Sequence, residues 1–287
     1  MIKGCFVVLH YNTIEVTEQC IKSIQEMENQ NEIAIVIVDN ASSNGTGKIL
    51  ENKYSNCGKI KVLLRKYNDG FSSGNNAGCQ FAIDEWNPEF LIVANNDIQF
   101  PQKDFLQKVD TEFKISRFDI AGPDIINPIK HIHQSPMAIN PPNLKEVNRT
   151  ILMNQCVLAL FPFLYPAMKK YFFRLDNIDR SLCPKQYQVN VCLMGACLIF
   201  SRQYIKSRNK LFEPETKFYY EENIQTLWCQ KNGKKIVYQP EIKVWHWERK
   251  ATEALDNNMK NQILFRMENT LSAAKVYRNF LKELERK

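Results

Sequence analysis

Two adjacent carboxylates follow an aromatic run in the last third of the chain. Glu221 and Glu222 come directly after Phe218, Tyr219 and Tyr220 and precede a segment with helical spacing. A carboxylate packed among aromatic rings has its charged form disfavoured, which raises its pKa toward the range of a general base. A solvated pair at a helix N-terminus would have the same sequence, because negative charge is favoured there. The pattern therefore indicates either a proton acceptor or a helix cap.

Polar residues also follow two apolar runs nearer the N-terminus. Asp39 ends one run, where a carboxylate could hold a base or a ribose, and Asn95, Asn96 and Asp97 end another. Mg²⁺ and Mn²⁺ take carboxylate and substrate oxygens, so Asp97 is a candidate ligand for an ion that also holds a diphosphate. Turns stabilised by polar side chains would explain both patterns without a function.

Between these two runs lies a glycine-rich stretch, residues 68–78. Such a stretch can approach a diphosphate closely and offer backbone N–H groups at a helix N-terminus, or it can be a plain tight turn. It matches neither the GxGxxG dinucleotide fingerprint nor the P-loop. Much later, His246 stands between Trp245 and Trp247. That position suits a packed histidine or a contact with metal or phosphate.

The first hundred residues predict the framework that would position these groups. Short β-branched runs alternate with segments of helical spacing, which is typical of a parallel sheet covered by helices. Ligands of such sheets sit outside the carboxyl ends of the strands, where Asp39 and Asp97 stand. The predicted strands are 5–9, 33–38, 60–64 and 90–94, and the predicted helices are 16–28, 47–53 and 75–84.

The rest of the chain is patterned less regularly. Seven prolines interrupt residues 127–190, which predicts an irregular insertion or a lid. Regular patterning returns at 191–201, 222–231 and 235–238, and an amphipathic stretch from Asn257 to the end predicts one or two helices.

Composition limits the class of protein. The chain has 287 residues, 44% of them hydrophobic and 24% charged, which is typical of a folded protein of one large or two small domains. The net charge of +7 suits an anionic ligand or surface, but it is spread along the sequence and forms no nucleic-acid-binding stripe. Nine scattered cysteines predict reduced thiols. We expect neither a signal peptide nor a transmembrane segment.

Taken in order, these motifs resemble those of the family 2 inverting glycosyltransferases, especially the bacterial rhamnosyltransferase-like members. The resemblance implies an α/β fold of the GT-A type, a Rossmann-like nucleotide-diphospho-sugar transferase fold with a mixed central sheet and C-terminal helices. Its boundaries would be a catalytic domain at 1–255, with the insertion at about 127–190, and a helical extension at 256–287. The matching segments are 10–12, 38–42, 68–71, 74–78, 95–97, 195–196, 221–224 and residue 246.

The resemblance implies a role for each matched residue. Glu222 would be the catalytic base, with Glu221 as the second candidate. Asp97 and His246 would hold Mn²⁺ or Mg²⁺, although Asn95 replaces the first aspartate of the family's DXD motif and so lowers the expected metal affinity. Gly195 and Ala196 would lie beneath the acceptor. The donor nucleotide would contact His10, Tyr11, Asn12, Asp39, Asn68, Gly70, Phe71, Asn75, Asn76, Asn95 and Asn96.

The implied reaction moves a hexosyl or deoxyhexosyl group from a dTDP-, UDP- or GDP-sugar to a saccharide or lipid-linked saccharide, with inversion. The expected setting is bacterial synthesis of capsule, O-antigen or exopolysaccharide in the cytoplasm. Residues 151–175 combine aromatic side chains with cations, which predicts either contact with the inner face of the plasma membrane or a buried satellite helix. The alternatives are a sugar nucleotidyltransferase and an inactive homologue that binds a sugar nucleotide or a glycan.

Overall fold

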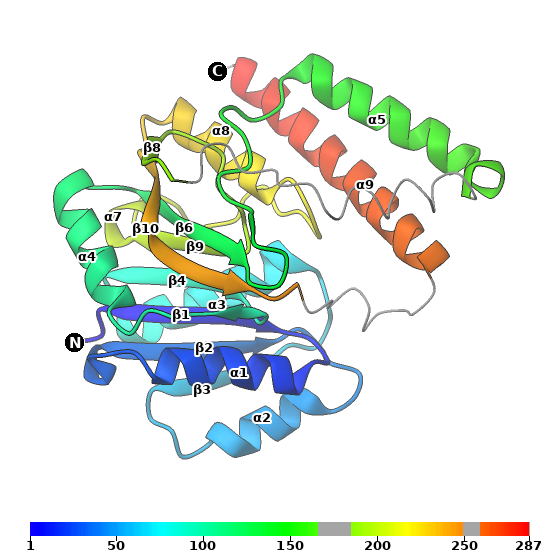
Figure 1. Ribbon diagram of the computed structural model, residues 1–287. Helices are drawn as coiled ribbons and strands as arrows, with labels where there is room; N and C mark the ends of the chain where they lie inside the picture. The colour runs from blue at the N-terminus through cyan, green and yellow to red at the C-terminus, as the bar shows by residue number, and fades with distance from the viewer. Residues whose placement is uncertain (166–184, 249–258, 287) are drawn as a thin grey trace.

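A single mixed sheet organises the computed structural model of the chain, which describes residues 1–165, 185–248 and 259–286 (Figure 1). Its strands lie in the order β3-β2-β1-β4-β9-β6-β10-β5, with β7 beside β6 and β8 beside β10. The strands are β1 Gly4–His10, β2 Ile33–Asp39, β3 Ile60–Leu64, β4 Phe90–Asn95, β5 Ile98–Gln99, β6 Ile120–Asn127, β7 Ile132–His133, β8 Gln188–Val189, β9 Cys197–Ser201 and β10 Ile236–His246.

Strands β1 to β4 confirm the four strands predicted from the first hundred residues. Strands β2 and β4 pair parallel to β1 on either side, and β3 pairs parallel to β2. Strand β9 is antiparallel to both β4 and β6, which makes the sheet mixed. The carboxyl ends of the parallel strands therefore meet at one edge, where the predicted polar residues stand.

Helices cover both faces of this sheet. Side chains of β1 alternate between the two cores: Phe6 and Val8 pack with α1, α2 and α4, while Cys5 and Val7 pack with α3 and α7. This alternation is the period of two expected of a strand buried on both sides. The helices are α1 Ile14–Gln25, α2 Thr46–Tyr54, α3 Phe71–Trp86, α4 Phe105–Ser116, α5 Leu144–Ala159, α7 Arg202–Ile205, α8 Glu221–Lys231 and α9 Met259–Glu285, with a 3₁₀ turn at Gln30–Glu32.

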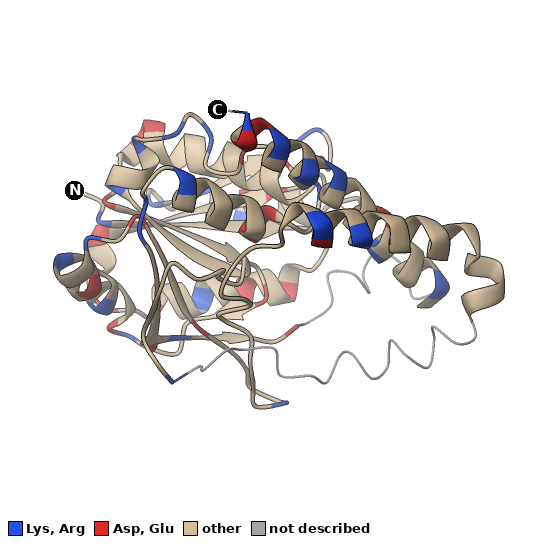
Figure 2. Ribbon diagram, turned by 90° about the horizontal axis from the view of Figure 1, so that it is seen from above, with Lys and Arg blue, Asp and Glu red and all other residues tan. Residues whose placement is uncertain are grey.

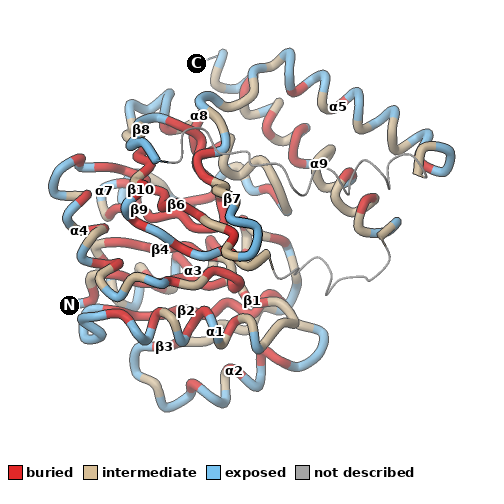
Figure 3. Tube along the Cα trace, in the orientation of Figure 1, coloured by how far each residue is buried: buried red, intermediate tan, exposed pale blue. Residues whose placement is uncertain are grey.

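Helices α5 and α9 form an antiparallel pair that projects beyond the sheet (Figure 1). Val147, near the start of α5, packs with Tyr277, near the end of α9, whereas Phe161, just after α5, packs with Met267, in the first half of α9. The far end of the pair is less buried than the sheet (Figure 3). Helix α9 confirms the helix predicted for the C-terminal stretch.

The prediction that 127–190 is irregular was wrong for its middle, because α5 is a helix of 16 residues. The helix begins with a capping box in which Asn143 and Glu146 each accept a backbone N–H from the other. Prolines 141 and 142 lie just before this cap, where they end the preceding segment without breaking the helix.

Two other boundaries differ from the prediction. Regular structure was expected from 191, but β9 begins only at Cys197, because the preceding residues turn toward α8. Strand β10 was expected to end at Tyr238 and instead continues to His246 past a bulge between Gln239 and Lys243. The longer strand carries His246 to the edge of the sheet that holds the site.

Lysines and arginines are spread over helices and loops (Figure 2). In the parts of the chain that the structure describes, we find no helix that combines the length and the apolar character needed to cross a bilayer.

Close packing between α3 and the sheet generates the first prediction. A methyl group on Gly78 would lie 2.5 Å from side-chain carbons of both Val38 and Val7, which are buried in rigid strands. We expect Gly78→Ala to lower the free energy of unfolding by about 1–3 kcal/mol in urea denaturation, although alanine favours a helix. Gly58→Ala is the matched control, since nothing lies within 4 Å of its added methyl. Equal stability of the two variants would contradict this packing.

Candidate active site

The carboxylate of Asp39, at the end of β2, is 5% exposed and is held by the turn that follows it. One carboxylate oxygen accepts hydrogen bonds from the backbone N–H and the hydroxyl of Ser42. The other lies against Gly47, where an added methyl would be 2.2 Å away. Gly47 therefore leaves the space that Asp39 occupies. The structure places Asp39 at the carboxyl edge, as predicted.

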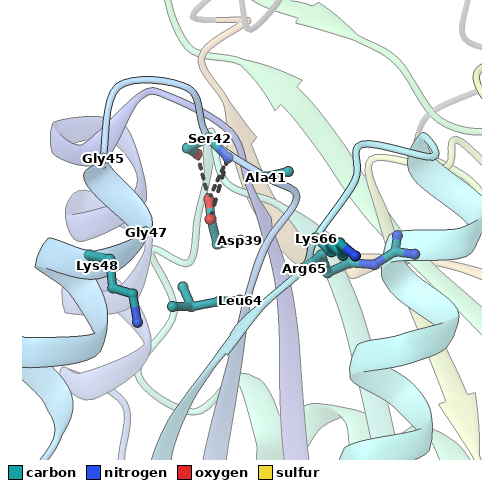
Figure 4. Close-up of a pocket in the computed structure, with 9 residues that line it drawn as sticks. All are labelled: Asp39, Ala41, Ser42, Gly45, Gly47, Lys48, Leu64, Arg65 and Lys66. Atoms are coloured by element: carbon teal, nitrogen blue, oxygen red, sulfur yellow. Dashed lines mark hydrogen bonds between the residues drawn. The ribbon is translucent and has the colours of Figure 1, made fainter.

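A cavity of about 410 Å³ lies beside Asp39 (Figure 4). Lys48 lies on one side of it, and Arg65 and Lys66 lie on the other. The Arg65 guanidinium donates to the side chains of Asn40, Asp69 and Ser73, which holds it in place. A carboxylate acceptor surrounded by cations suits a nucleobase N–H and nearby phosphate or ribose oxygens.

His10 lies inside the fold behind Asp39, with no exposed surface. Its ring nitrogens are 2.7 Å from the hydroxyl of Thr17 and 2.9 Å from that of Thr46. Burial lowers the pKa of His10, and the nearby Asp39 carboxylate offsets only part of this effect, so the ring is neutral near pH 7. This geometry gives His10 a positioning role and does not favour the predicted direct contact with the donor.

Next to His10 in the chain, Tyr11 and Asn12 connect β1 to α1. Asn12 has a left-handed backbone, its N–H donates to the hydroxyl of Ser42, and its side-chain oxygen accepts from the N–H of Ser43. It thus braces the turn that holds Asp39. Tyr11 is partly exposed beside it. Both predicted donor residues lie at the same edge as the cavity.

Asn95, Asn96 and Asp97 follow β4 directly, as predicted. The Asn96 amide donates to the hydroxyls of Thr13 and Thr17, so this triplet and His10 share the same partner, Thr17. Asp97 is 8% exposed. Neither Thr13 nor Thr17 was a predicted site residue, and no sequence motif marks them.

The Asp97 carboxylate pairs with His246, at the end of β10. Nε2 of His246 lies 3.3 Å from Oδ1 of Asp97, and Nδ1 donates to the side-chain oxygen of Gln134 at 2.7 Å. Burial lowers the pKa of His246, but Asp97 and Glu248 raise it more, so the net shift is upward. Two residues about 150 positions apart in the sequence therefore meet, as the resemblance implied.

This pair fits a divalent ion. When an ion binds, Nε2 would give up its proton while Nδ1 keeps the proton that Gln134 accepts, so Nε2 and the Asp97 carboxylate could bind the same ion. No cluster of three or more potential protein ligands occurs in the described ranges. Two protein ligands are compatible with Mg²⁺ or Mn²⁺, since such ions keep waters and take substrate phosphate oxygens. The remaining ligands would come from the donor.

The glycine-rich stretch differs from its prediction, because α3 begins at Phe71 and contains most of it. Only Gly70 has a positive φ, 93°, and an added methyl there would lie 2.3 Å from the carbonyl oxygen of Lys217. Asn68 accepts from the N–H of Gly70, and the N–H of Phe71 donates to the carbonyl of Lys217. The stretch thus packs tightly against the segment just before the acidic pair.

Asn75 and Asn76 lie inside the fold. The Asn76 amide donates to the carbonyl of Phe212 and accepts from its N–H, while Asn75 donates to the carbonyl of Phe71. Asn76 thus holds the backbone of Phe212, and Asn75 holds the preceding turn of α3. This arrangement does not favour the predicted contact of Asn75 and Asn76 with the donor.

The acidic pair begins α8, and both residues are partly buried. The N–H of Gly195 points at Oε1 of Glu222, 3.3 Å away, and an added methyl on Gly195 would lie 2.8 Å from this oxygen. Glu221 accepts a long contact of 3.5 Å from the hydroxyl of Thr216. Both predicted base candidates are therefore fixed at the helix N-terminus, and Gly195 leaves room for one of them.

The turn before α8 is strained, and the C-terminal helix supports it. Tyr219 and Tyr220 have φ values of 69° and 66°, a left-handed conformation that costs about 1–3 kcal/mol for each non-glycine residue. The ring of Tyr220 packs on Tyr277 of α9 at 5.3 Å between centroids, and Phe218 packs on Phe265 at 5.2 Å. Helix α9 therefore helps to aim the acidic pair.

Both carboxyl groups have raised pKa values, for different reasons. Burial raises the pKa of Glu221, and the charge of Glu222 raises it further, to well above the ordinary value of 4.5. Burial also raises the pKa of Glu222, but backbone hydrogen bonds, including the one from Gly195, oppose that effect. Glu221 therefore keeps its proton to higher pH, and Glu222 is ionised first.

One backbone hydrogen bond connects the polar triplet after β4 with the segment that contacts the acidic pair of α8. The N–H of Asn95 donates to the carbonyl of Ala196 at 2.9 Å, next to Gly195, which contacts Glu222. The strand-end triplet and the acidic pair are thus connected through two consecutive residues. Ala196 is buried and its carbonyl contacts Asn95, whereas the Gly195 N–H contacts Glu222.

The sequence profile of glycosyl transferase family 2 matches residues 5–178, more than half of the chain. The chain belongs to glycosyltransferase family 2. A segment of 92 residues, 32% of this chain and 28% of the relative, is 29% identical to the low-salt glycan biosynthesis hexosyltransferase Agl10 of Haloferax volcanii. The chain thus spans less than a third of that relative's length.

Solved structures confirm the GT-A-type fold predicted for this family member. S. aureus TarS 1–349 in complex with UDP is similar over 85% of this chain and 60% of that one, with a TM-score of 0.55 and 17% identity. GalNAc-T7 with UDP, GalNAc and Mn²⁺ is similar over 86% of this chain and 44% of that one, with a TM-score of 0.58 and 13% identity.

The pair of Asp97 and His246 generates a prediction for metal binding. Removing a ligand leaves one protein group for the ion, so we expect Asp97→Asn and His246→Gln each to weaken Mn²⁺ binding about 10- to 100-fold in calorimetric titrations with UDP present. Asp84→Asn, an exposed change on α3, is the control and should bind as the parent does. Unchanged affinity of Asp97→Asn would contradict this site.

The raised pKa of Glu221 generates a prediction for stability. Above the ordinary glutamate pKa of 4.5 the unfolded chain loses this proton while the folded chain retains it, so rising pH destabilises the fold. We expect Glu221→Gln to raise the free energy of unfolding near neutral pH by about 0.5–2 kcal/mol. The gain should vanish below pH 4.5, where both states are protonated.

The control for this stability measurement is Glu85→Gln, which changes an exposed glutamate of α3 and should have no such pH-dependent effect. A Glu221→Gln variant that is less stable than the parent near neutral pH would show that the ionised carboxylate is favoured in the fold. That outcome would contradict the assignment of a retained proton to Glu221.

Proposed function

We propose that this chain is an inverting glycosyltransferase that moves a hexosyl or deoxyhexosyl group from a nucleotide-diphosphate sugar to a saccharide acceptor. The observation that carries this proposal is a pair of neighbouring hydrogen bonds. The N–H of Gly195 contacts Glu222, and the carbonyl of the next residue, Ala196, accepts from the N–H of Asn95. These bonds set a proton acceptor beside the residues suited to hold the donor diphosphate. Family membership supports the reaction class and weighs against a sugar nucleotidyltransferase.

UDP is the favoured nucleotide, ahead of dTDP and GDP. An ionised Asp39 accepts hydrogen bonds, so it suits a ring N–H of uracil, thymine or guanine in the adjacent cavity, and the preference for UDP rests on the similar structures. The structures of TarS and of GalNAc-T7 contain UDP, and a further TarS structure contains UDP-GlcNAc. These similarities support a UDP-sugar donor for this chain.

The proposed chemical step is a single displacement. The acceptor hydroxyl attacks the anomeric carbon, the new C–O bond forms as the bond to the diphosphate oxygen breaks, and the hydroxyl proton passes to Glu222. Inversion follows because attack and departure occur on opposite sides of this carbon. Bound at Asp97 and His246, Mg²⁺ or Mn²⁺ would neutralise charge on the leaving diphosphate.

The choice of Glu222 over Glu221 rests on their surroundings. A base must be ionised, and Glu222 loses its proton first because the Gly195 N–H stabilises its charge. Protonated Glu221 avoids placing two negative charges side by side. We therefore assign the base to Glu222 and a positioning role to Glu221.

We also propose a biological role, based on the name of a relative. Agl10 is named for glycan biosynthesis, and it resembles about a third of this chain. We propose that the product is a bacterial surface polysaccharide, such as capsule, O-antigen or exopolysaccharide, assembled on the cytoplasmic side. The domain limits of 1–255 and 256–287 remain part of this proposal.

Kinetics of the two glutamate variants test the base assignment. We expect Glu222→Gln to lower kcat about 10²- to 10⁴-fold while UDP binding is unchanged, and Glu221→Gln to retain most of the parent's activity. The parent's kcat should fall on the acid side through a pKa above 4.5, since the proton acceptor must be ionised. NMR of the anomeric proton should show an inverted linkage.

Several outcomes would contradict this function. Retention of configuration would exclude single displacement, and full activity of Glu222→Gln would exclude it as the base. UDP binding without transfer or hydrolysis of any UDP-, dTDP- or GDP-sugar tested would favour the inactive homologue, to which Asn95 and the Glu221–Glu222 pair also point.

A further inference from the structure

The outer face of α5 and of the helical residues 161–165 that follow it is apolar and exposed to solvent. Leu152, Met153, Leu160 and Phe163 are 62%, 54%, 51% and 83% exposed. Scattered exposed apolar residues are normal, but these lie within three turns of one another at one end of a helix. No charged side chain occurs in residues 150–165. The patch formed by these four side chains is therefore uninterrupted by charge.

The same helix face becomes basic toward its N-terminus. Lys145, Arg149, Leu152 and Cys156 follow one another at intervals of four, three and four residues, which places them in one stripe, and all are exposed. The stripe changes from cationic to apolar over about 10 Å between residues 145 and 152, at 1.5 Å per residue. Figure 2 shows this change along α5, with charged residues, Lys145 and Arg149 beside Glu146, near its start and none toward its far end.

The apolar end belongs to the part of the molecule that projects beyond the sheet (Figures 1 and 3). Phe161 turns inward and packs with Ile263 and Met267 of α9, so the end of the pair is a folded unit. Phe163, two residues later, turns outward. Residues 161–165 thus present apolar side chains both inward, at Phe161, and outward, at Phe163. Of these two side chains, only Phe161 packs against another part of the described chain.

We propose that this end of the α5–α9 pair inserts into the surface of an anionic lipid bilayer. A lipid surface accounts for both parts of the stripe. Acyl chains receive Leu152, Leu160 and Phe163, while acidic headgroups pair with the basic residues Lys145 and Arg149, about one to two turns before Leu152. A buried apolar interface with another protein would explain the apolar part of the stripe but not the basic part. The net charge of +7 adds attraction to such a surface.

Docking at this end would bring the acidic pair of α8 toward the membrane. Helix α9, one half of the pair, packs through Phe265 and Tyr277 on the aromatic residues that precede Glu221. Resting on the proposed function, we infer that the acceptor saccharide is linked to a lipid whose head is presented at the bilayer surface. A soluble acceptor would need no such contact.

Sedimentation with vesicles tests the docking. The full chain should bind vesicles that contain one third phosphatidylglycerol, and bind pure phosphatidylcholine less well. The double variant Leu160→Glu/Phe163→Glu should bind the anionic vesicles about tenfold or more weakly, because it loses apolar area and adds negative charge. Lys145→Gln and Arg149→Gln should each weaken binding to anionic vesicles about fivefold and leave binding to neutral ones unchanged.

The matched control is Ile115→Glu, which changes a 76% exposed residue of α4 in the same way. It should bind vesicles as the parent does. Absence of vesicle binding by the parent, or equal loss in the control, would overturn the proposal. So would a concentration-dependent dimer in gel filtration that Leu160→Glu/Phe163→Glu abolishes, since the patch would then bind a second copy.

Two further measurements separate this inference from the proposed function. Thermal unfolding and UDP binding of Leu160→Glu/Phe163→Glu should match those of the parent, which shows that the fold and the donor site are intact. If vesicles bind but no sugar nucleotide is turned over, the proposed function fails while the docking surface stands. If transfer to a water-soluble acceptor proceeds but vesicles do not bind, the docking surface fails alone.

Discussion

A pair of backbone hydrogen bonds at consecutive residues joins the two chemical halves of this glycosyltransferase. The N–H of Asn95 bonds to the carbonyl of Ala196, and the N–H of Gly195 points at Glu222. Because β9 runs antiparallel to β4, the chain enters β9 beside the end of β4 and not at its start. The mixed sheet thus brings Glu222 of α8, the proposed base, to the residues that follow β4.

There is little space for an added side chain where these segments meet. A methyl on Gly195 would collide with Glu222, and one on Gly70 would collide with Lys217, just before the acidic pair. Strain at Tyr219 and Tyr220 persists because α9 packs against this turn. The C-terminal helix therefore contributes to the geometry of the site as well as to the fold.

The sequence predicted the framework better than the details of the site. The four parallel strands follow from β-branched runs, and Asp39, Asp97 and His246 lie where the family resemblance implied. Helix α5 was not predicted because the prolines around it indicated irregular structure, although Asn143 and Glu146 have the spacing of a capping box. His10 and Asn76 have buried positioning contacts that depend on partners distant in the sequence, and the role of Gln134 beside His246 depends on such a contact as well. Local patterns carry no information about those partners.

The most direct test of this account is a crystal structure of the chain with UDP and Mn²⁺, with the metal located by its anomalous scattering. The account predicts one Mn²⁺ bound by Asp97 and His246 and by diphosphate oxygens, the uracil ring beside Asp39, and open space between the diphosphate and Glu222 that an acceptor sugar can fill. A metal bound elsewhere, or a nucleotide that lies away from Asp39 and the end of β4, would contradict it.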